Sequence, residues 1–286
     1  MTNLGFLYEK GRGVTQDYRQ ARQWYEKAAA GENVRAISNL GDLYRDGHGV
    51  AQDYQKARQW YEKAAAAGSA DAMDNLGFLY ENGQGTPPDY QKARDWYGKA
   101  AAGGNVHAMD NLGRLCRDGK GVAQDYQKAR DWFEKAAAGE DADAMDNLGF
   151  LYEKGEGVPQ DFQKASDWYR KTLALKPGDA DTYNSLGYAL AEAGRFDEAF
   201  PYLEKALQIH PHDPKILDSA AFVLAAKGGY KTAVAKYRQA IQADPKNAVI
   251  HSHMAQALAK LGQAEHSKRE FDEAYRLDPQ LKTHPE

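Results

Sequence analysis

Residues 72–97 read AMDNLGFLYENGQGTPPDYQKARDWY, and this stretch decides the fold. Its tryptophan belongs to a series in which each member follows the previous one by the same interval: Trp24, Trp60, Trp96, Trp132 and Trp168. A spacing that regular indicates tandem copies of one structural unit. The length of 286 residues would by itself suggest two average domains. The tryptophans show instead that the chain is an array of repeats.

Each copy contains the pattern of two amphipathic helices. In the second helix of residues 72–97, Ala93, Trp96 and Tyr97 form an apolar stripe of helical period, and the residues between them are polar. We expect Gly83 to end the first helix as a left-handed C-terminal cap. Asp89 is expected to begin the second helix as its N-cap. Each repeat is therefore predicted to be a helical hairpin.

A glycine interrupts the first helix of every copy. Gly77 lies in mid-helix, where glycine costs roughly 1 kcal/mol relative to alanine. The equivalent glycine nevertheless returns in the other copies, as Gly5, Gly41, Gly113 and Gly149. We expect close packing against another helix to compensate for this cost.

These residues resemble a known family. The pattern Leu-Gly, Tyr, Gly-x-Gly-Val, Asp, Lys-Ala, Trp-Tyr and Lys-Ala-Ala-x-x-Gly is similar to the Sel1-like repeat, an α/α solenoid module. Five copies cover about residues 1–179. Two positions depart from the pattern, since Cys116 replaces the usual tyrosine and Thr86-Pro87-Pro88 replaces Val-Ala-Gln in one loop.

The array continues after the last tryptophan with a different, shorter period. Pro211, Pro245 and Pro279 recur at equal intervals, together with small and apolar residues at matching places. Their spacing resembles that of the tetratricopeptide repeat, whose period is about 34 residues. Three such copies occupy residues 180–281, and residues 282–286 form a C-terminal tail.

The fifth copy combines both spacings. The interval from Gly149 to Ala165 equals the one found in the earlier copies, whereas the interval from Ala165 to Gly187 equals the one found in the later copies. We therefore expect one continuous solenoid and not two domains on a flexible linker. The predicted fold is all-α, an α/α solenoid with a right-handed superhelix of about eight helix-turn-helix hairpins.

The repeats leave no segment for a separate catalytic domain, since they account for nearly all of the 286 residues. A solenoid hairpin contacts only its neighbours, so function is expected on the surface that stacking creates. We predict a non-enzymatic interaction scaffold or adaptor, without a cofactor, that binds a partner protein or peptide in a concave groove. The first helices of the hairpins are expected to line that groove.

An asparagine recurs in each Sel1-like copy at a position expected to face the groove: Asn3, Asn39, Asn75, Asn111 and Asn147. Its amide carries both donors and an acceptor, so it can bond the backbone of an extended peptide without reading its sequence. The alternative is that this asparagine hydrogen-bonds one hairpin to the next. Both interpretations remain open at the level of sequence.

The position three residues later varies although the rest of the unit is nearly copied. It holds Phe6, Asp42, Phe78, Arg114, Phe150, Tyr188, Phe222 and Gln256 in successive copies. Such variation favours side chains free of packing constraints, and aromatic residues in a groove can anchor a partner. The alternative is drift, with some of the phenylalanines packed against a preceding turn.

The remaining groove candidates argue against two kinds of ligand, a strongly charged peptide and a C-terminal carboxylate. Arg45 and Asp46 make the groove mixed in charge, so a strongly acidic or basic peptide is not expected. Asn184 is expected in the groove of the sixth copy, beside Tyr188. The three later copies lack the Lys and Asn pattern with which tetratricopeptide domains clamp a C-terminal carboxylate.

Other candidates for chemistry are weak. His251 and His253 are two positions apart and point to different faces of a helix, and no further ligand completes a metal shell. Cys116 occupies a core tyrosine position, which predicts a buried, unreactive thiol. Gly47-His48-Gly49 follows a helix, whereas phosphate-binding glycine loops follow a strand and open a helix.

Composition excludes further classes. The 37 basic and 41 acidic residues give no electrostatic reason to expect nucleic acid or an anionic membrane. No stretch of about 18 apolar residues could span a bilayer, and one cysteine cannot form an intramolecular disulfide. No leader is recognisable, so the bacterial cytoplasm and the periplasm or envelope both remain open.

Two other functions remain as alternatives. The first repeat lacks the start of its first helix and the last has no polar capping helix, so both ends are expected to expose apolar surface. The protein could therefore be a structural subunit that associates end to end. A cell-wall-directed hydrolase is implied only by the resemblance to some relatives, and no nucleophile and base pair supports it.

Overall fold

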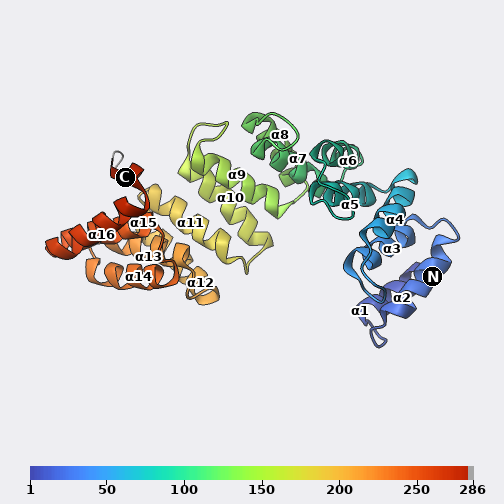
Figure 1. The fold of residues 1–286 in the computed structure, drawn as a ribbon, viewed down its shortest axis with the longest axis horizontal. Coiled ribbons are helices and arrows are strands. Elements are labelled where there is room, and N and C mark those ends of the chain that lie inside the picture. Colours follow the sequence, from blue (N-terminus) through green and yellow to red (C-terminus); the bar gives the residue numbers. More distant parts are fainter. Residues whose placement is uncertain (283–286) are drawn as a thin grey trace. The chain divides into compact units, whose positions relative to one another are not determined.

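The structure is a computed structural model that describes residues 1–282. Within these residues all regular structure is helical, with sixteen α-helices, one short 3-10 helix and no strand. The chain forms two compact units, Met1–Ala144 and Met145–Glu286. The division falls inside α9 and not at the change of repeat type near residue 179. Figure 1 shows the succession of helices along the chain.

In the first unit, consecutive helices pack as hairpins, and the second helix of each of the first three hairpins also packs against the first helix of the following hairpin. The hairpins are α1 with α2, α3 with α4, α5 with α6, and α7 with α8. Their bounds are Thr2–Lys10, Tyr18–Ala29, Val34–Asp46, Tyr54–Ala66, Ala70–Glu81, Tyr90–Ala102, Val106–Asp118 and Tyr126–Ala138.

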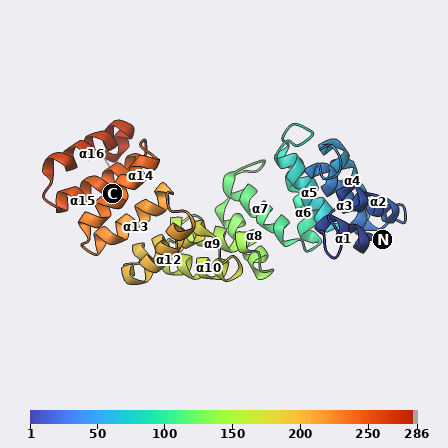
Figure 2. The same cartoon turned by 90° about the horizontal axis from the view of Figure 1, so that it is seen from below.

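The second unit continues the same pattern, and Figure 2 shows its last hairpins from below. The predicted tail is described only at Lys282, the end of the short helix η1, and residues 283–286 lie outside the described part. The bounds of α9 to α16 and η1 are Ala142–Lys154, Phe162–Leu175, Ala180–Glu192, Phe196–Ile209, Pro214–Ala226, Tyr230–Ala243, Ala248–Lys260, Ala264–Leu277 and Pro279–Lys282. The expected all-α fold of about eight hairpins is confirmed. Continuity of the solenoid over the whole chain stays a prediction.

The helix ends follow the capping residues. The Asp89 carboxylate accepts a hydrogen bond from the backbone N–H of Lys92 over 2.9 Å and so satisfies one free donor at the start of α6. Asp53, Asp125 and Asp161 cap α4, α8 and α10 in the same way. At the other end, α5 closes through Asn82, and Gly83 follows with a φ of +65°.

The mid-helix glycine is explained by contact with a tyrosine. A methyl group added to Gly77 would lie 2.5 Å from Cδ1 of Tyr97, which is fully buried in the core of the hairpin. The equivalent ring in the other Sel1-type copies is also fully buried, or 1% exposed in the fifth: Tyr25, Tyr61, Phe133 and Tyr169. Glycine is therefore what lets the first helix approach the ring of the second, as the sequence predicts.

The tryptophans that reveal the repeat are not its deepest residues. Each is half-buried, and Trp60 packs against the buried cluster that contains Tyr25, in the preceding hairpin. Trp96 packs in the same way against the cluster of Tyr61. A lysine one helical turn later covers each ring, with Lys99 Nζ 4.1 Å from the centre of Trp96. The tryptophans thus lie at the edge of clusters that span two successive hairpins, whereas the rings that follow them in sequence are buried inside these clusters.

The Gly-x-Gly loop has a packing role. Gly49 has a φ of +69°, and a Cβ there would lie 2.7 Å from Cβ of Tyr18 in the preceding hairpin. A larger residue would be strained in its backbone and would also separate the two hairpins. The loop geometry accounts for these glycines without a phosphate.

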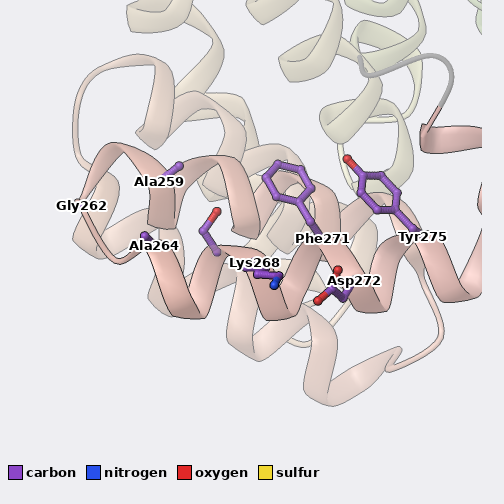
Figure 3. A pocket seen from close by; sticks show the side chains of 8 residues that line it. Ala259, Gly262, Ala264, Lys268, Phe271, Asp272 and Tyr275 are labelled. Atoms are coloured by element: carbon purple, nitrogen blue, oxygen red, sulfur yellow. The ribbon is translucent and has the colours of Figure 1, made fainter.

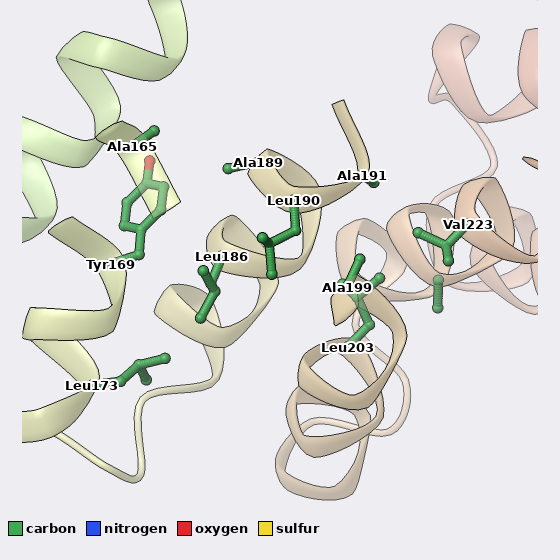
Figure 4. Close-up of a cluster of buried hydrophobic side chains, with 11 residues drawn as sticks. Ala165, Tyr169, Leu173, Leu186, Ala189, Leu190, Ala191, Ala199, Leu203 and Val223 are labelled. Carbon is green, nitrogen blue, oxygen red and sulfur yellow. The ribbon is translucent and has the colours of Figure 1, made fainter. Parts of the chain in front are cut away.

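The change of repeat type lies inside a packed core. Tyr169 and Leu173 on α10, from the fifth copy, share one buried cluster with Leu186 and Leu190 on α11 (Figure 4). The same cluster includes Leu203 on α12. Apolar contacts between α10 and α11 therefore hold together the two helices on either side of the link.

Candidate functional site

The first helices of the second unit enclose a pocket of about 550 Å³. Its lining comes from three consecutive first helices: Tyr188 and Glu192 on α11, Asp218, Ser219 and Phe222 on α13, and Val249, His253 and Gln256 on α15. Side chains one repeat period apart in sequence thus meet in one place because successive hairpins present the same helix face. Tyr188 and Phe222, both predicted from sequence, are brought together here. We call this set of residues the second-unit groove pocket.

A histidine organises the second-unit groove pocket. His253 Nδ1 lies 2.9 Å from Asp218 Oδ1, a contact that joins α15 to α13. The centre of its ring is 6.2 Å from that of Phe222 and 6.1 Å from that of the buried Tyr237. His251, two residues earlier on α15, contacts Glu270 instead, over 2.6 Å. The two histidines therefore face different elements, as their spacing predicts.

Asn184 lies one helical turn before Tyr188 on the same face of α11. Its side-chain oxygen is buried and has no hydrogen-bond partner among the described residues. An unpaired acceptor in such a position is unfavourable unless a donor reaches it. Asn184 does not line the second-unit groove pocket, and its expected role in the groove stays a prediction.

A smaller pocket of about 370 Å³ lies on α3 and α5 in the first unit. Asn75 and Phe78 line it, together with Arg45 and Asp46. The side chain of Phe78 is 41% exposed. Arg45 donates a hydrogen bond from Nη1 to Oδ1 of Asn75 over 3.1 Å and is paired with Asp46 over 2.7 Å. The predicted mixture of charges around an exposed aromatic residue is present at this pocket.

The recurrent asparagines bond between hairpins at two of their positions. Asn75 accepts from Arg45, and Asn111 donates from Nδ2 to Oδ1 of Asp74 over 3.1 Å, in each case across to the preceding hairpin. Asn39 lies within hydrogen-bonding reach of the Tyr25 hydroxyl. Asn147 is half-buried on α9. These contacts favour the inter-hairpin interpretation at Asn75 and Asn111, and the peptide ladder stays a prediction.

The variable position serves different purposes in different copies. The Asp42 carboxylate accepts a hydrogen bond from the hydroxyl of the buried Tyr61 over 2.7 Å. Arg114 donates to Asn111 over 2.9 Å. Phe150 lies under Lys154, whose Nζ is 5.9 Å from the ring centre. Asp42 and Arg114 thus have partners within the fold, which the sequence pattern did not reveal.

The last hairpin carries a third pocket, of about 410 Å³, on α15 and α16 (Figure 3). The rings of Phe271 and Tyr275 are stacked there with centres 5.7 Å apart. Ala259 and Ala264 form its small apolar walls, and Lys268 and Asp272 lie along α16. Phe271 and Tyr275 are each half-buried there, and association through the ends stays a prediction.

Neither a metal centre nor a membrane span emerges from the described residues. Among residues 1–282, no three His, Cys, Asp or Glu side chains are grouped as metal ligands would be. The helices in that range are also too short or too polar to cross a bilayer. Cys116 is half-buried and not fully buried as predicted, and this partial burial raises the pKa of its thiol.

The repeats match known families. The family model for the Sel1 repeat matches residues 1–33, 34–69, 70–105, 106–141 and 142–175. Tetratricopeptide repeat models match residues 180–213, 221–262 and 248–281. Because the Sel1 matches cover more than half of the chain, the protein belongs to the Sel1 repeat family, and its predicted composition of five and three repeats is confirmed. Proteins built from these repeats are generally scaffolds for protein–protein interaction.

Solved structures with the same repeats are similar. A protective antigen of uropathogenic Escherichia coli strains with an SLR fold is 28% identical, with a TM-score of 0.79 over 96% of this chain. The chain spans 60% of that antigen's length. A Sel1 repeat protein from Oxalobacter formigenes is 33% identical over 72% of this chain and 86% of its own, with a TM-score of 0.66.

A more distant likeness concerns the fold alone. MamA from Desulfovibrio magneticus RS-1 is 17% identical, with a TM-score of 0.52 over 61% of this chain and 96% of its own. A search of the curated proteins gave no significant match.

Two acidic residues of the second-unit groove pocket, Glu192 and Asp218, were not predicted from the sequence. Asp218 follows Asn184 by one period of the tetratricopeptide-type repeat, so alignment of the copies places both at the same position. That signal was available from the sequence. The period alone, however, does not show which equivalent positions converge on a cavity.

Proposed function

We propose that this protein is a non-enzymatic adaptor that binds a segment of a partner protein in the groove of its first helices. The second-unit groove pocket is the main anchor point. The observation that carries the proposal is the convergence of Tyr188, Phe222 and His253 on one pocket of about 550 Å³. Large aromatic residues in a recess are the side chains that most often dominate binding energy at protein interfaces.

The pocket's chemistry defines the segment that fits it. Tyr188, Phe222 and Val249 offer apolar surface for one large apolar side chain. Glu192 and Asp218 add carboxylates, and no lysine or arginine is among the described residues that line the pocket. Ser219 and Gln256 add polar groups that can bond the backbone of an extended chain. The proposed ligand is therefore an extended segment with an apolar side chain next to a basic one.

A peptide selection on the full chain tests this proposal. Peptides displayed on phage and selected against the wild-type protein should be enriched in an apolar residue beside Lys or Arg. Synthetic forms of the selected peptides would then be measured by calorimetry. Phe222→Ala and Tyr188→Ala should each weaken binding by about tenfold or more, which corresponds to roughly 1.4 kcal/mol.

Ile209→Ala is the matched control. Ile209 is 41% exposed at the end of α12, outside the pocket, so its truncation removes similar apolar surface without touching the groove. Equal binding by all three variants and the wild type would contradict the groove as the site. Circular dichroism of each variant separates lost binding from lost folding.

The first-unit groove is proposed as a second point of contact. Phe78 is its exposed aromatic residue, and Phe78→Ala should weaken a segment bound to the first unit. Asn75→Ala separates the two interpretations of the asparagines. If Asn75 bonds the peptide, affinity falls while stability is kept; if it serves only Arg45, stability falls and affinity is unchanged.

A second candidate function rests on the pocket of the last hairpin. The stacked Phe271 and Tyr275 present apolar surface beside α16, which suits the first helix of another hairpin. The protein would then act as a structural subunit that associates through this hairpin. Light scattering at increasing concentration should show oligomers that Phe271→Ser abolishes. A wild-type protein that stays monomeric at high concentration would refute this function.

A further inference from the structure

A pocket of about 900 Å³ opens among the second helices of the first unit. It lies between α6 and α8 and is floored by Leu112 and Cys116 on α7. Val122 in the following loop and Trp132 on α8 complete its apolar walls. Its volume falls in the range of roughly 300 to 1,000 Å³ that is typical of ligand pockets. None of the groove residues discussed above lines it.

The pocket exists where a ring is missing. The other four Sel1-type copies have a tyrosine at the position of Cys116: Tyr8, Tyr44, Tyr80 and Tyr152. The backbone around the position is unchanged. The Asp125 N–H donates to the Cys116 carbonyl over 2.9 Å, as the Asp89 N–H donates to the Tyr80 carbonyl over 2.8 Å. The fourth copy therefore keeps the backbone arrangement that surrounds the tyrosine in the other copies, although its own side chain has no ring.

The cation that covers this ring is also retained. Lys92 Nζ lies 5.4 Å from the ring centre of Tyr80, and Lys164 Nζ lies 5.2 Å from that of Tyr152. Lys128 holds the corresponding place in the fourth copy and lines the pocket, with its Nζ 3.0 Å from the Asp125 carboxylate. A lysine over an aromatic face is attractive. The positive charge of Lys128 can therefore attract the face of an aromatic ring in the pocket.

A second difference widens the pocket. Gly98 on α6 stands where three other copies have glutamate, and a Cβ at Gly98 would meet no atom within 4 Å. In the second copy that glutamate, Glu62, pairs with Arg58 over 3.5 Å. The equivalent Arg94 has no glutamate at this place, and its side chain is 40% exposed against 30% for Arg58. Both departures from the copied unit therefore enlarge the same pocket.

We propose that this pocket binds the aromatic side chain of a partner protein, in the place that a tyrosine ring occupies in the other Sel1-type copies. Leu112, Val122 and Trp132 bury the edges of the ring, and Lys128 covers its face. The space opened at Gly98 accommodates the backbone that carries the ring. The protein would then have a contact point on its second helices, separate from the groove of its first helices.

The single cysteine provides a direct measurement. Cys116 is the only thiol in the chain, so its rate of reaction with a thiol reagent reports on this pocket alone. p-Cresol, the side chain of tyrosine, should slow the reaction several-fold and saturably. 4-Methylcyclohexanol has a similar size but no π-face, and it should protect much less. Equal protection by the two compounds, or none by p-cresol, would overturn the proposal.

A second experiment distinguishes the side chain of a partner protein from a free aromatic molecule as the ligand. N-Acetyl-tyrosine amide carries the ring on a peptide-like backbone and should bind at least as tightly as p-cresol. Exclusion of the amide while p-cresol still binds would show that the pocket takes only small free molecules, which contradicts a protein partner.

Two variants test the missing ring itself. Cys116→Tyr should fill the pocket, raise the melting temperature and abolish the chemical-shift changes that p-cresol causes in NMR spectra. In that background, Tyr80→Cys with Glu62→Gly should rebuild the pocket one copy earlier, and p-cresol should protect the introduced thiol. Persistent p-cresol shifts in Cys116→Tyr would refute the assignment, whether or not the triple variant folds.

Discussion

The Cα atom of Gly77 lies directly against the ring of Tyr97, so close that a methyl group at this glycine would come within 2.5 Å of Cδ1. The contact joins the first and second helices of one hairpin. It recurs between Gly113 and Phe133 and between Gly149 and Tyr169. The spacing of the two helices in the Sel1-type hairpin therefore depends on the absence of one side chain.

Gly77→Ala should destabilise the protein although alanine is the better helix former. The gain in helix propensity is about 1 kcal/mol, whereas overpacking a core costs typically about 1–3 kcal/mol or more. Gly98→Ala is the matched control, since Gly98 also lies within a helix but meets no atom within 4 Å. Urea unfolding should show a lower midpoint for the first variant and a higher one for the second. A higher midpoint for both would show that the packing contact is unimportant.

Tyr97→Phe should cost about 1–3 kcal/mol, because the variant removes a hydrogen bond to a charged group. The Tyr97 hydroxyl donates to Oε2 of Glu81 over 2.8 Å. The fourth copy has Phe133, and Arg117 stands where Glu81 stands in the third. Phe133→Tyr should therefore also destabilise, since no carboxylate stands at the place of Glu81 to accept from the new hydroxyl. Denaturant unfolding of the two variants would contradict this account if Phe133→Tyr proved the more stable.

The stability of the fold should fall at alkaline pH. Burial, assisted by the charge of a neighbouring carboxylate, raises the pKa of Tyr61, Tyr97 and Tyr169 above the ordinary value for tyrosine. Burial raises the pKa of Tyr25 and Tyr237 as well. Above pH about 10 the unfolded chain loses these protons while the folded chain keeps them, so unfolding becomes easier as pH rises.

Ultraviolet titration measures this effect. The chain has 18 tyrosines, and the buried ones should remain un-ionised in the folded protein until it unfolds. The same titration in concentrated urea should ionise all tyrosines in one step. A single step in the native protein near the ordinary pKa would contradict the buried phenols.

Asp74→Asn should stabilise the protein increasingly as pH rises from acid to neutral. Burial raises the pKa of Asp74, and the hydrogen bond from Asn111 only partly opposes this. A carboxyl whose pKa is raised on folding loses stability as pH increases from its unfolded to its folded pKa. The asparagine cannot ionise and still accepts from Asn111. Parallel pH–stability curves for the variant and the wild type would argue against a buried charge at this position.

Much of the fold was predictable because the repeat amplifies local signals. Asp89 and Gly83 mark helix ends in one copy, and their recurrence in every Sel1-type copy distinguishes a structural requirement from chance. Mid-helix Gly77 indicated a close contact for the same reason. The tryptophan spacing indicated the unit correctly, but not that Tyr97 is fully buried while Trp96 is only half-buried at the edge of a cluster.

The candidate site was less predictable. Tyr188 and Phe222 were expected in a groove and do line one pocket. Asp42 was expected there too, yet it accepts a hydrogen bond from Tyr61. Variation at a repeated position has two causes, freedom from contacts and a change of partner. The two cannot be separated until the neighbouring helix is in place.

The sequence by itself determined the helices, their pairing into hairpins and the number and types of repeats, because capping residues and apolar periodicity act over a few turns. Only the tertiary structure decided which side chains face a cavity. The pocket at Cys116 needs α6, α7 and α8 together, and it opens because the fourth copy lacks a ring that the other four Sel1-type copies have. A cavity depends on the atoms around it, and here those atoms come from three helices of two successive copies, which only the packing of the hairpins brings together.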